Sequence, residues 1–393
     1  MARIYLDNAA TTPVRPEVVE AMVPLLGGGY NPSSLHAEGR AARAALDTAR
    51  ETVARVLGAT AREIVFTAGG SEADVLAIVG AARARARADA AERADGAPTP
   101  GHVVTTAIEH HAVLHAVDVL ERDGWRVTRL PVDANGLVAA DAFAAALTPE
   151  TAVASVMLAN NETGTIEPVA RLAAIARERG VLFHTDAIQA AGWLPLDVDA
   201  LGVDLLSLSA HKLHGPKGAG ALYVRRGTPL EPLIVGGPQE HGLRAGTEDV
   251  AGIAGLATAL ALAEAERPGT GARVTALRDR LEAGVLAALP GVLVNGAGAP
   301  RLPNILSVAF ADAPSDALLI RLDLEGIAAS AGSACAAGSL EPSHVIAALG
   351  VPDRYRTGVV RFSLSRVTTD AEVDEVLAKL PVLLANVRTP LAV

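Results

Sequence analysis

The chain has 393 residues, half of them apolar, so it is long enough to bury one large or two medium hydrophobic cores. Its 44 acidic and 34 basic residues leave a net charge of −10, which argues against direct binding to nucleic acid or to an anionic membrane. The first eight residues lack the apolar core of a signal peptide, and the longest nearly apolar run (250–263) is shorter than the ~20 residues of a membrane span. A single cysteine suits a reducing compartment, so we expect a cytoplasmic protein.

Up to residue 263, short apolar runs typical of buried strands alternate with longer Ala-, Leu- and Arg-rich segments typical of helices. The strands are expected at 63–67, 102–106, 127–130, 153–158, 181–184, 203–208 and 219–224. The helices are expected at 71–88, 112–123 and 169–179. Continuous apolar strands that alternate with helices predict an α/β fold with a mostly parallel central sheet.

The pattern changes after residue 263. The sequence Pro-Gly-Thr-Gly at 268–271 predicts a break, and a helix is expected after it at 274–289. The strands expected at 305–310 and 359–364 alternate more between apolar and polar residues, so we predict a smaller α+β domain over residues 264–393. The arginine-rich segment 81–100 is predicted to be a solvated helix followed by an exposed loop.

The only cysteine, Cys335, lies among twelve consecutive small residues, 328–339. A single thiol can form neither an internal disulfide nor, alone, a cysteine-based zinc or iron–sulfur site. A lone cysteine is most often a small core residue, but the Gly, Ala and Ser residues around this one offer nothing bulky to pack against it. The setting favours a thiol that reaches a substrate and then a partner.

A second reactive side chain is predicted at Lys212. Among the 34 basic residues the only lysines are Lys212, Lys217 and Lys379. Lys212 follows the strand expected at 203–208 and precedes a Gly-Pro-Lys-Gly turn, so it projects from a strand end. Most lysines simply face solvent. In a chain that otherwise uses arginine, a lysine in this position indicates an amine that must lose its proton, as covalent catalysis requires.

Polar residues also follow other expected strands, at the edge where a parallel sheet binds its ligands. Gly70 and Ser71 open a helix and can cradle an anion, or they can simply start the helix with Glu72 nearby. No Walker A or G-x-G-x-x-G sequence is present, so a nucleotide is not indicated. Asp186 follows the strand at 181–184, and a buried carboxylate there requires a cation.

Histidines and amides occupy two further strand ends. His110 can stack on a planar ring or shuttle a proton. His111 and His115 are four residues apart, but neither an H-E-x-x-H motif nor a thiolate cluster accompanies them, so we predict no metal. Asn160 and Asn161 form either an ordinary turn or a set of ligand hydrogen bonds. A lysine, a buried aspartate, an anion cradle and a histidine are together what a pyridoxal phosphate (PLP) site requires.

Motifs spread over essentially the whole length resemble the cysteine desulfurase family (NifS/IscS-like), PLP enzymes of the fold-type I, class V aminotransferase superfamily. The motifs are Tyr-Leu-Asp-Asn-Ala-Ala-Thr-Thr-Pro at 5–13, Asn-Pro-Ser-Ser-Leu-His at 31–36, Glu-His-His-Ala-Val at 109–113, Asn-Asn-Glu-Thr-Gly at 160–164, Asp-Ala-Ile-Gln at 186–189, Ser-Ala-His-Lys at 209–212, Arg-Ala-Gly-Thr at 244–247, Gly-Ser-Ala-Cys at 332–335, Leu-Glu-Pro-Ser-His at 340–344 and Arg-Phe-Ser-Leu at 361–364. The small-residue segment at Cys335 resembles the long-loop branch of this family.

The resemblance implies the fold and the domain limits. A large PLP-binding domain with a mostly parallel central sheet is expected at 15–263. A smaller α+β domain is expected to combine residues 1–14 and 264–393 and to carry a catalytic cysteine loop at about 328–343. The family also implies a homodimer.

Roles for individual residues follow from the same resemblance. Lys212 would bind PLP covalently and act as general base, Asp186 would pair with the ring nitrogen, and His110 would stack on the ring and move protons. Cys335 would be the nucleophile. The other expected contacts are Gln189 and Asn161 at the phenolic oxygen of the ring, Gly70, Ser71, Ser209 and His211 at the phosphate with Thr247 of a second subunit, and Arg361 with Asn31 at the substrate carboxylate.

The implied activity removes sulfur from L-cysteine and leaves L-alanine and a persulfide on Cys335. The persulfide would pass to an acceptor protein for iron–sulfur cluster assembly or another sulfur-transfer pathway. One alternative is another PLP reaction, that of an aminotransferase or a selenocysteine lyase, and an aminotransferase has no need of Cys335. The other is a non-catalytic binding protein, which has no need of Lys212, Asp186 and Cys335 together.

Three residues depart from the usual family motifs. Val75 stands where the family commonly has an amide, so one polar contact there is absent. Pro238 and His241 alter a sequence that is usually Gly-Gly-Gly-Gln-Glu-Arg, which we expect to stiffen a loop near the shared site of the dimer.

Overall fold

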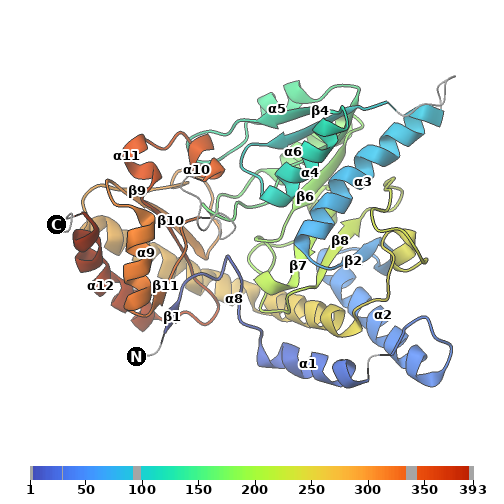
Figure 1. Ribbon diagram of the computed structural model, residues 1–393, viewed down its shortest axis with the longest axis horizontal. Helices are drawn as coiled ribbons and strands as arrows, with labels where there is room; N and C mark the ends of the chain where they lie inside the picture. The colour runs from blue at the N-terminus through green and yellow to red at the C-terminus, as the bar shows by residue number, and fades with distance from the viewer. Residues whose placement is uncertain (1–2, 29, 92–98, 333–342, 389–393) are drawn as a thin grey trace.

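The computed structural model describes residues 3–28, 30–91, 99–332 and 343–388, which form a larger unit on a seven-stranded sheet and a smaller unit on a three-stranded sheet (Figure 1). The helices are α1 (Pro16–Gly27), α2 (Ala37–Leu57), α3 (Gly70–Ala91), α4 (His111–Arg122), α5 (Ala140–Ala146), α6 (Val169–Glu178), α7 (Val198–Leu201), α8 (Val250–Ala288), α9 (Ser315–Leu324), α10 (His344–Ala348), α11 (Asp353–Arg356) and α12 (Asp370–Arg388), with 3-10 turns η1 (Ala61–Glu63), η2 (Ala210–Lys212) and η3 (Glu240–Gly242). The strands are β1 (Ile4–Tyr5), β2 (Ile64–Thr67), β3 (His102–Thr106), β4 (Arg126–Leu130), β5 (Thr151–Ser155), β6 (Leu182–Asp186), β7 (Leu205–Ser209), β8 (Gly220–Val224), β9 (Val292–Val294), β10 (Ile305–Phe310), β11 (Ile327–Ala328) and β12 (Val359–Ser363). Within this part of the chain no helix combines the length and the apolar character that a bilayer crossing needs.

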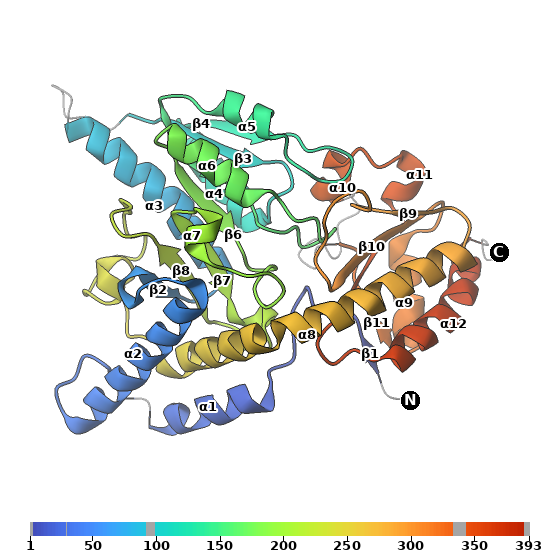
Figure 2. The same ribbon diagram turned by 180° about the vertical axis from the view of Figure 1, so that it is seen from behind.

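The large sheet has the strand order β2-β8-β7-β6-β5-β3-β4. Neighbours from β7 to β4 run parallel, and β8 alone is antiparallel to both of its neighbours. The prediction of an α/β fold with a mostly parallel sheet is therefore confirmed. Both faces of the sheet are buried: α3 and α4 pack on one, and α2, α6 and the first half of α8 pack on the other (Figures 1 and 2).

The expected strands between residues 63 and 224 are all present, with small shifts at their ends. The largest shift is in β5, which was expected to extend to residue 158 and ends at Ser155. The next residues stay buried beside β6 outside the regular ladder, where the Leu158 N–H donates to the Asp186 carbonyl at 2.9 Å. The helix expected in the segment 81–100 continues to Ala91, and residues 92–98 lie outside the described part of the chain.

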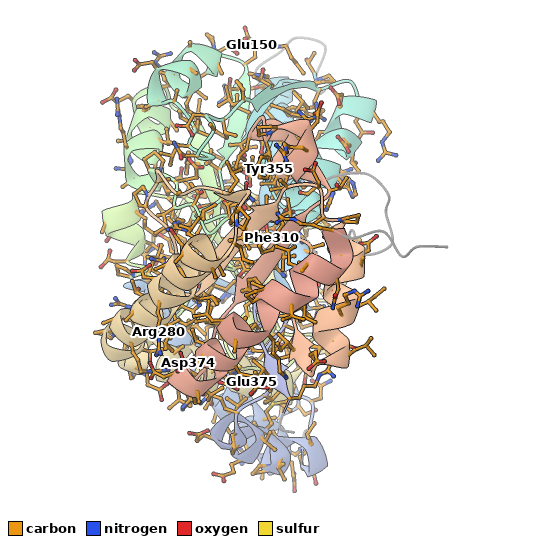
Figure 3. The ribbon with its side chains drawn as sticks, turned by 90° about the vertical axis from the view of Figure 1, so that its left-hand side faces the viewer. Glu150, Arg280, Phe310, Tyr355, Asp374 and Glu375 are labelled. Carbon is orange, nitrogen blue, oxygen red and sulfur yellow. The ribbon has the colours of Figure 1, made fainter. Side chains whose placement is uncertain are left out.

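The smaller unit has its own sheet and core. β10 lies between β12 and β9 in an antiparallel sheet, and β1 pairs with β11 in parallel. The second half of α8, α9 and α12 bury a separate apolar cluster against these strands. Arg280 of α8 forms ion pairs with Asp370 and Asp374 of α12 at the surface of this unit (Figure 3). The exact limits of the two predicted domains stay a prediction, because α8 belongs to both cores.

The break expected at 268–271 is wrong. α8 continues through Pro268 without interruption and runs from the larger unit into the smaller unit (Figure 2). A proline removes one helical hydrogen bond, but contacts on either side of it hold the helix. In the turn before it, Glu266 pairs with Arg15, and in the turns after it Leu277 is buried. Tertiary packing therefore overrides the local propensity of the Pro-Gly-Thr-Gly sequence.

Replacing Gly269 by Ala tests this continuity. A Cβ at Gly269 would meet no atom within 4 Å, so alanine gains helix propensity without a clash. We expect Gly269→Ala to raise the free energy of unfolding by about 0.5–1 kcal/mol, measured by urea denaturation followed by circular dichroism. Gly350 is the matched control, because its Cβ position is equally open but its φ is +66°. Gly350→Ala should lower the stability by about 1 kcal/mol, and a loss at Gly269 would contradict a helical backbone there.

Candidate active site

A cavity of about 230 Å³ lies at the carboxyl edge of the large sheet. Parallel strands bring their ends together there, so residues far apart in sequence meet at one site. Of the residues predicted from the sequence, those that line it are Gly70, Ser71, His110, Asn161, Asp186, Gln189, Ser209, His211, Lys212 and Arg361. Lining residues that the sequence did not indicate are Ala9, Ala10, Met157 and Ile188.

Lys212 ends the 3-10 turn η2, directly after strand β7. Its Nζ donates hydrogen bonds to the carbonyl oxygens of Ala9 and Ala10, at 2.6 and 2.7 Å. Gln189 Nε2 donates to the same Ala9 oxygen at 2.9 Å. The N-terminal segment therefore holds the lysine amine at the wall of the cavity through the backbone oxygens of Ala9 and Ala10.

The start of α3 forms an anion cradle. A Cβ at Gly70 would lie 2.1 Å from Ile188 Cδ1 and 3.3 Å from Ser209 Cβ, so a larger residue would displace the Ile188 side chain, whereas glycine lets the helix backbone line the cavity. The free N–H groups and the dipole of this 22-residue helix favour a negative group. Hydroxyls of Ser71 and Ser209 line the same wall. His211 also lines it, and burial lowers its pKa to about 4, so it is neutral at pH 7.

Asp186 is the last residue of β6 and is buried. Its Oδ1 accepts a hydrogen bond from the Ile188 N–H at 2.9 Å. Burial raises the pKa of Asp186 to about 6, against the opposing effect of this hydrogen bond and of Lys212. A second carboxyl, Asp74, is buried nearby, and burial together with Asp186 raises its pKa well above the usual range. A cation placed against Asp186 would restore its ionised form.

His110 caps the start of α4. Its Nδ1 accepts a hydrogen bond from the Ala112 N–H at 3.1 Å, so the neutral ring carries its proton on Nε2. Burial, followed by the charge of Lys212, lowers the pKa of His110 to about 4. In this position His110 can stack on a ligand and donate a hydrogen bond. It can accept a proton at Nδ1 only after it releases Ala112.

Arg361 lies on β12 and is buried, with 1% of its surface exposed. Nη1 donates to the carbonyl oxygen of Asn161 at 2.8 Å, and Nη2 donates to Asp7 Oδ1 at 2.9 Å. Nε has no hydrogen-bond partner among the residues that the structure describes. The smaller unit thus contributes a guanidinium with an unused N–H to a cavity formed mainly by the larger unit.

Two predicted residues that the structure describes, Asn31 and Thr247, do not line the cavity, and a third predicted residue, Cys335, is not described. Asn31 is exposed, and its Oδ1 accepts from the Ser33 N–H at 2.9 Å. Thr247 is exposed in the single chain. Cys335 lies outside the described residues, but the described residues on either side of its segment both lie against Glu162, next to Asn161. Ser343 Oγ donates to Glu162 Oε2 at 2.7 Å, and a Cβ at Gly332 would lie 2.5 Å from that oxygen.

The three departures from the family motifs are all placed away from the cavity lining. Val75 lies on α3 and is a partly buried residue that packs against the core cluster on that side of the sheet. Pro238 and His241 flank Glu240, whose buried carboxylate pairs with Arg50 at 2.6 Å. His241 is exposed and has a φ of +60°.

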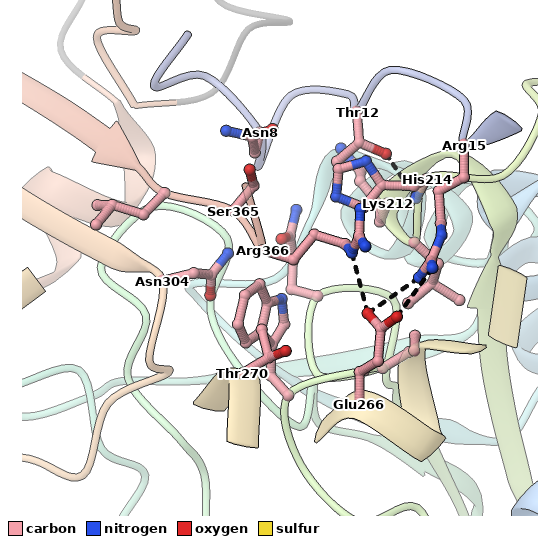
Figure 4. A pocket seen from close by; sticks show the side chains of 17 residues that line it. Asn8, Thr12, Arg15, Lys212, His214, Glu266, Thr270, Asn304, Ser365 and Arg366 are labelled. Carbon is pink, nitrogen blue, oxygen red and sulfur yellow. Dashed lines mark hydrogen bonds and ion pairs between the residues drawn. The ribbon is translucent and has the colours of Figure 1, made fainter. Parts of the chain in front are cut away.

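A second, much smaller cavity shares the lining residues Gln189 and Lys212 with the first (Figure 4). Glu266 accepts hydrogen bonds from Arg15 at 2.9 and 3.0 Å and from Arg366 at 3.0 Å, so these three charged residues of the lining pair with one another. Its volume of about 40 Å³ has room for a few water molecules and not for a cofactor. Clusters of three or more His, Cys, Asp or Glu side chains suited to a metal ion do not occur in the described residues.

Comparisons with known proteins agree with this arrangement. The model of the aminotransferase class-V family matches residues 4–376. The chain is 47% identical to "Cysteine desulfurase IscS" of Dictyoglomus turgidum over 388 residues, 98% of this chain and 95% of the relative. It is 46% identical to "Cysteine desulfurase NifS" of Azotobacter vinelandii over 390 residues, 99% of this chain and 94% of the relative.

A solved structure titled "NIFS-LIKE PROTEIN" superposes with a TM-score of 0.87 at 36% identity, covering 98% of this chain and 100% of the other. Sequence and structure thus agree over nearly the full length. The chain belongs to the class-V aminotransferase family and, within it, to the cysteine desulfurases, which are PLP-dependent enzymes.

Proposed function

We propose that this chain removes sulfur from L-cysteine with PLP held in the 230 Å³ cavity. The observation that carries the proposal is that an amine, a buried carboxyl, an anion cradle and a guanidinium with a free N–H line one cavity. The products in this proposal are L-alanine and a persulfide on Cys335, which passes its terminal sulfur to an acceptor protein.

The residues that are present fit PLP. Lys212 Nζ offers the amine that bonds to the cofactor aldehyde. Gly70 and Ser71 at the N-terminus of α3 line the cavity, and the N–H groups of a helix start favour a negative group such as a phosphate. Asp186 is a buried carboxyl that needs a cation, which the protonated ring nitrogen provides. When bound, PLP supplies the electron sink that weakens the bonds at the Cα of an amino acid.

The chain's own residues orient the substrate and move its protons. Arg361 binds the α-carboxylate of cysteine, and Lys212 Nζ, once free, takes the proton from Cα as general base. The Cys335 thiolate then attacks the substrate sulfur: the Cβ–S bond breaks and an S–S bond forms. Cβ receives a proton that balances the one lost by the Cys335 thiol, and Lys212 returns to Cα the proton that it took. Cysteine and an enzyme thiol thus become alanine and an enzyme persulfide without an external oxidant. His110, with its proton on Nε2, would stack on the ring and donate a hydrogen bond.

Assembly and partners complete the proposal. We infer a homodimer in which exposed Thr247 reaches the phosphate of the second subunit, as the resemblance implies. Asn31, also exposed, would assist Arg361. The acceptor is an iron–sulfur scaffold or a thiolation enzyme, and a single cysteine supports a reducing cytoplasm.

Anaerobic incubation of the PLP-loaded protein with L-cysteine tests the reaction. Wild type should release alanine, and its intact mass should increase by one sulfur atom. Cys335→Ala should keep the absorbance of bound PLP but lose both products, because the nucleophile is absent. Lys212→Arg should lose alanine as well, since arginine cannot act as a base at neutral pH. Bound cofactor without alanine release from wild type would sink the proposal.

The pH dependence of cofactor binding tests Asp186. Without cofactor its pKa is about 6, so its carboxylate is ionised above that pH and neutral below it. We expect the affinity of the apo-protein for PLP to fall as the pH drops from 8 through 6, measured by fluorescence titration. Asp186→Asn should bind PLP more weakly at pH 8 and lose this part of the pH dependence.

Glu167→Gln is the matched control, because burial raises the pKa of Glu167 to about 8 at a site that does not line the cavity. Its titration curve for PLP should follow that of wild type. Titration of the cofactor phosphate affects all three proteins alike, so the comparison isolates Asp186. An equal pH dependence in Asp186→Asn and wild type would remove the assigned role.

A further inference from the structure

Asp7 and Arg361 form a partly buried ion pair at the cavity. The guanidinium of Arg361 is held at two points: Nη1 by the Asn161 carbonyl and Nη2 by Asp7 Oδ1. These two oxygens come from different segments of the chain, so together they fix the plane of the guanidinium. Nε, which is buried, is the nitrogen that has no partner among the described residues. The two printed bonds use two of the five guanidinium N–H groups, so the pair fixes the orientation of Arg361 and still leaves N–H groups for a ligand in the cavity that Arg361 lines.

Backbone hydrogen bonds on either side of Asp7 hold this residue beside β12. Ser363 of β12 donates from its N–H to the Leu6 carbonyl at 2.7 Å, and the Asn8 N–H donates to the Ser363 carbonyl at 3.3 Å. Asp7 thus lies directly beside Ser363, two residues from Arg361 along the same strand. Side chains two residues apart on a strand point to the same face. The register between the N-terminal segment and β12 therefore determines where the Asp7 carboxylate meets Arg361.

We propose that Asp7 is a positioning residue that sets the orientation of Arg361 for the carboxylate of the substrate. An arginine side chain has several rotatable bonds, and holding it in one orientation before the ligand arrives reduces the entropy lost on binding. Asp7 bonds only to Nη2, with 21% of its own side chain exposed, and does not cover Nε. The inference rests on the proposed function, in which Arg361 binds the α-carboxylate, and adds to it the residue that makes Arg361 ready to bind.

The test compares cysteine with cysteamine, which has the same amine and thiol but no carboxylate. Binding of both is followed by the absorbance of PLP in a Cys335→Ala background, where sulfur is not transferred. Asp7→Ala should weaken the binding of cysteine by about tenfold, as expected for the loss of a charge-assisted hydrogen bond. It should leave the binding of cysteamine unchanged. Asp7→Asn, which keeps an oxygen for Nη2, should weaken cysteine binding by a smaller factor.

Two controls separate this role from a structural one. Asp323→Asn removes an exposed acidic residue that pairs with Arg3 of the same N-terminal segment, and it should change neither affinity. Arg361→Ala should remove the advantage of cysteine over cysteamine. If Arg361→Ala kept the same preference for cysteine over cysteamine as wild type, the role of Arg361 would be overturned, and this inference with it. The inference alone would be overturned if Arg361→Ala lost the preference for cysteine but Asp7→Ala bound cysteine as tightly as wild type or more tightly. It would also be overturned if Asp7→Ala weakened the binding of cysteine and cysteamine equally.

Discussion

The N-terminal segment 6–12 is the connection on which the geometry of the site depends. Its backbone bonds to Ser363 of the smaller unit at one end. At the other end Thr12 donates to the carbonyl of His211 in the larger unit, from its N–H at 3.0 Å and its hydroxyl at 2.9 Å. Between these points its carbonyls receive the amine of Lys212. One segment, which turns at residues 8–10, thereby contacts both cationic groups that handle the substrate.

The site also depends on how buried carboxyls share charge. Burial raises the pKa of Asp186 to about 6 and that of Glu109 to about 8, and it raises the pKa of Asp74 too. Glu109 accepts hydrogen bonds from the Thr106 hydroxyl and the Met157 N–H. Both donors are neutral, so they hold the carboxyl in place but supply no positive charge. Of the three, Asp186 is the one that lines the cavity, so it is the one a bound cation can ionise. The region therefore presents one effective negative charge to its ligand.

Sequence reasoning found the sheet and most of the cavity because both depend on residue type. Buried parallel strands are continuous apolar runs, and polar residues such as Asp186 and His110 stand out where those runs end. Ala9 and Ala10 could not be found in this way, because they act through backbone oxygens that every residue possesses. The break expected at Pro268 failed for the opposite reason: a local signal was strong, but packing in the folded state outweighs it.

The helices α1 and α2 were not anticipated, although α2 carries a readable signal. Its buried residues Ala42, Leu46, Ala49, Val53 and Leu57 are three or four positions apart, the spacing of a helix with one apolar face. Asp7 lies in a motif that supported the family resemblance, but nothing in its local sequence indicates a partner 354 residues away. Long-range ion pairs of this kind become visible only in three dimensions.

An unbroken helix of 39 residues that belongs to both cores has a mechanical consequence. It is roughly 58 Å long at 1.5 Å per residue. It forms a rigid support shared by the sheet that carries Lys212 and the strand that carries Arg361. Rotation of one unit against the other would have to bend this helix or break its packing. The distance between the Lys212 amine and the Arg361 guanidinium is consequently fixed. An amino acid binds when the distance between its Cα and its carboxylate matches that distance.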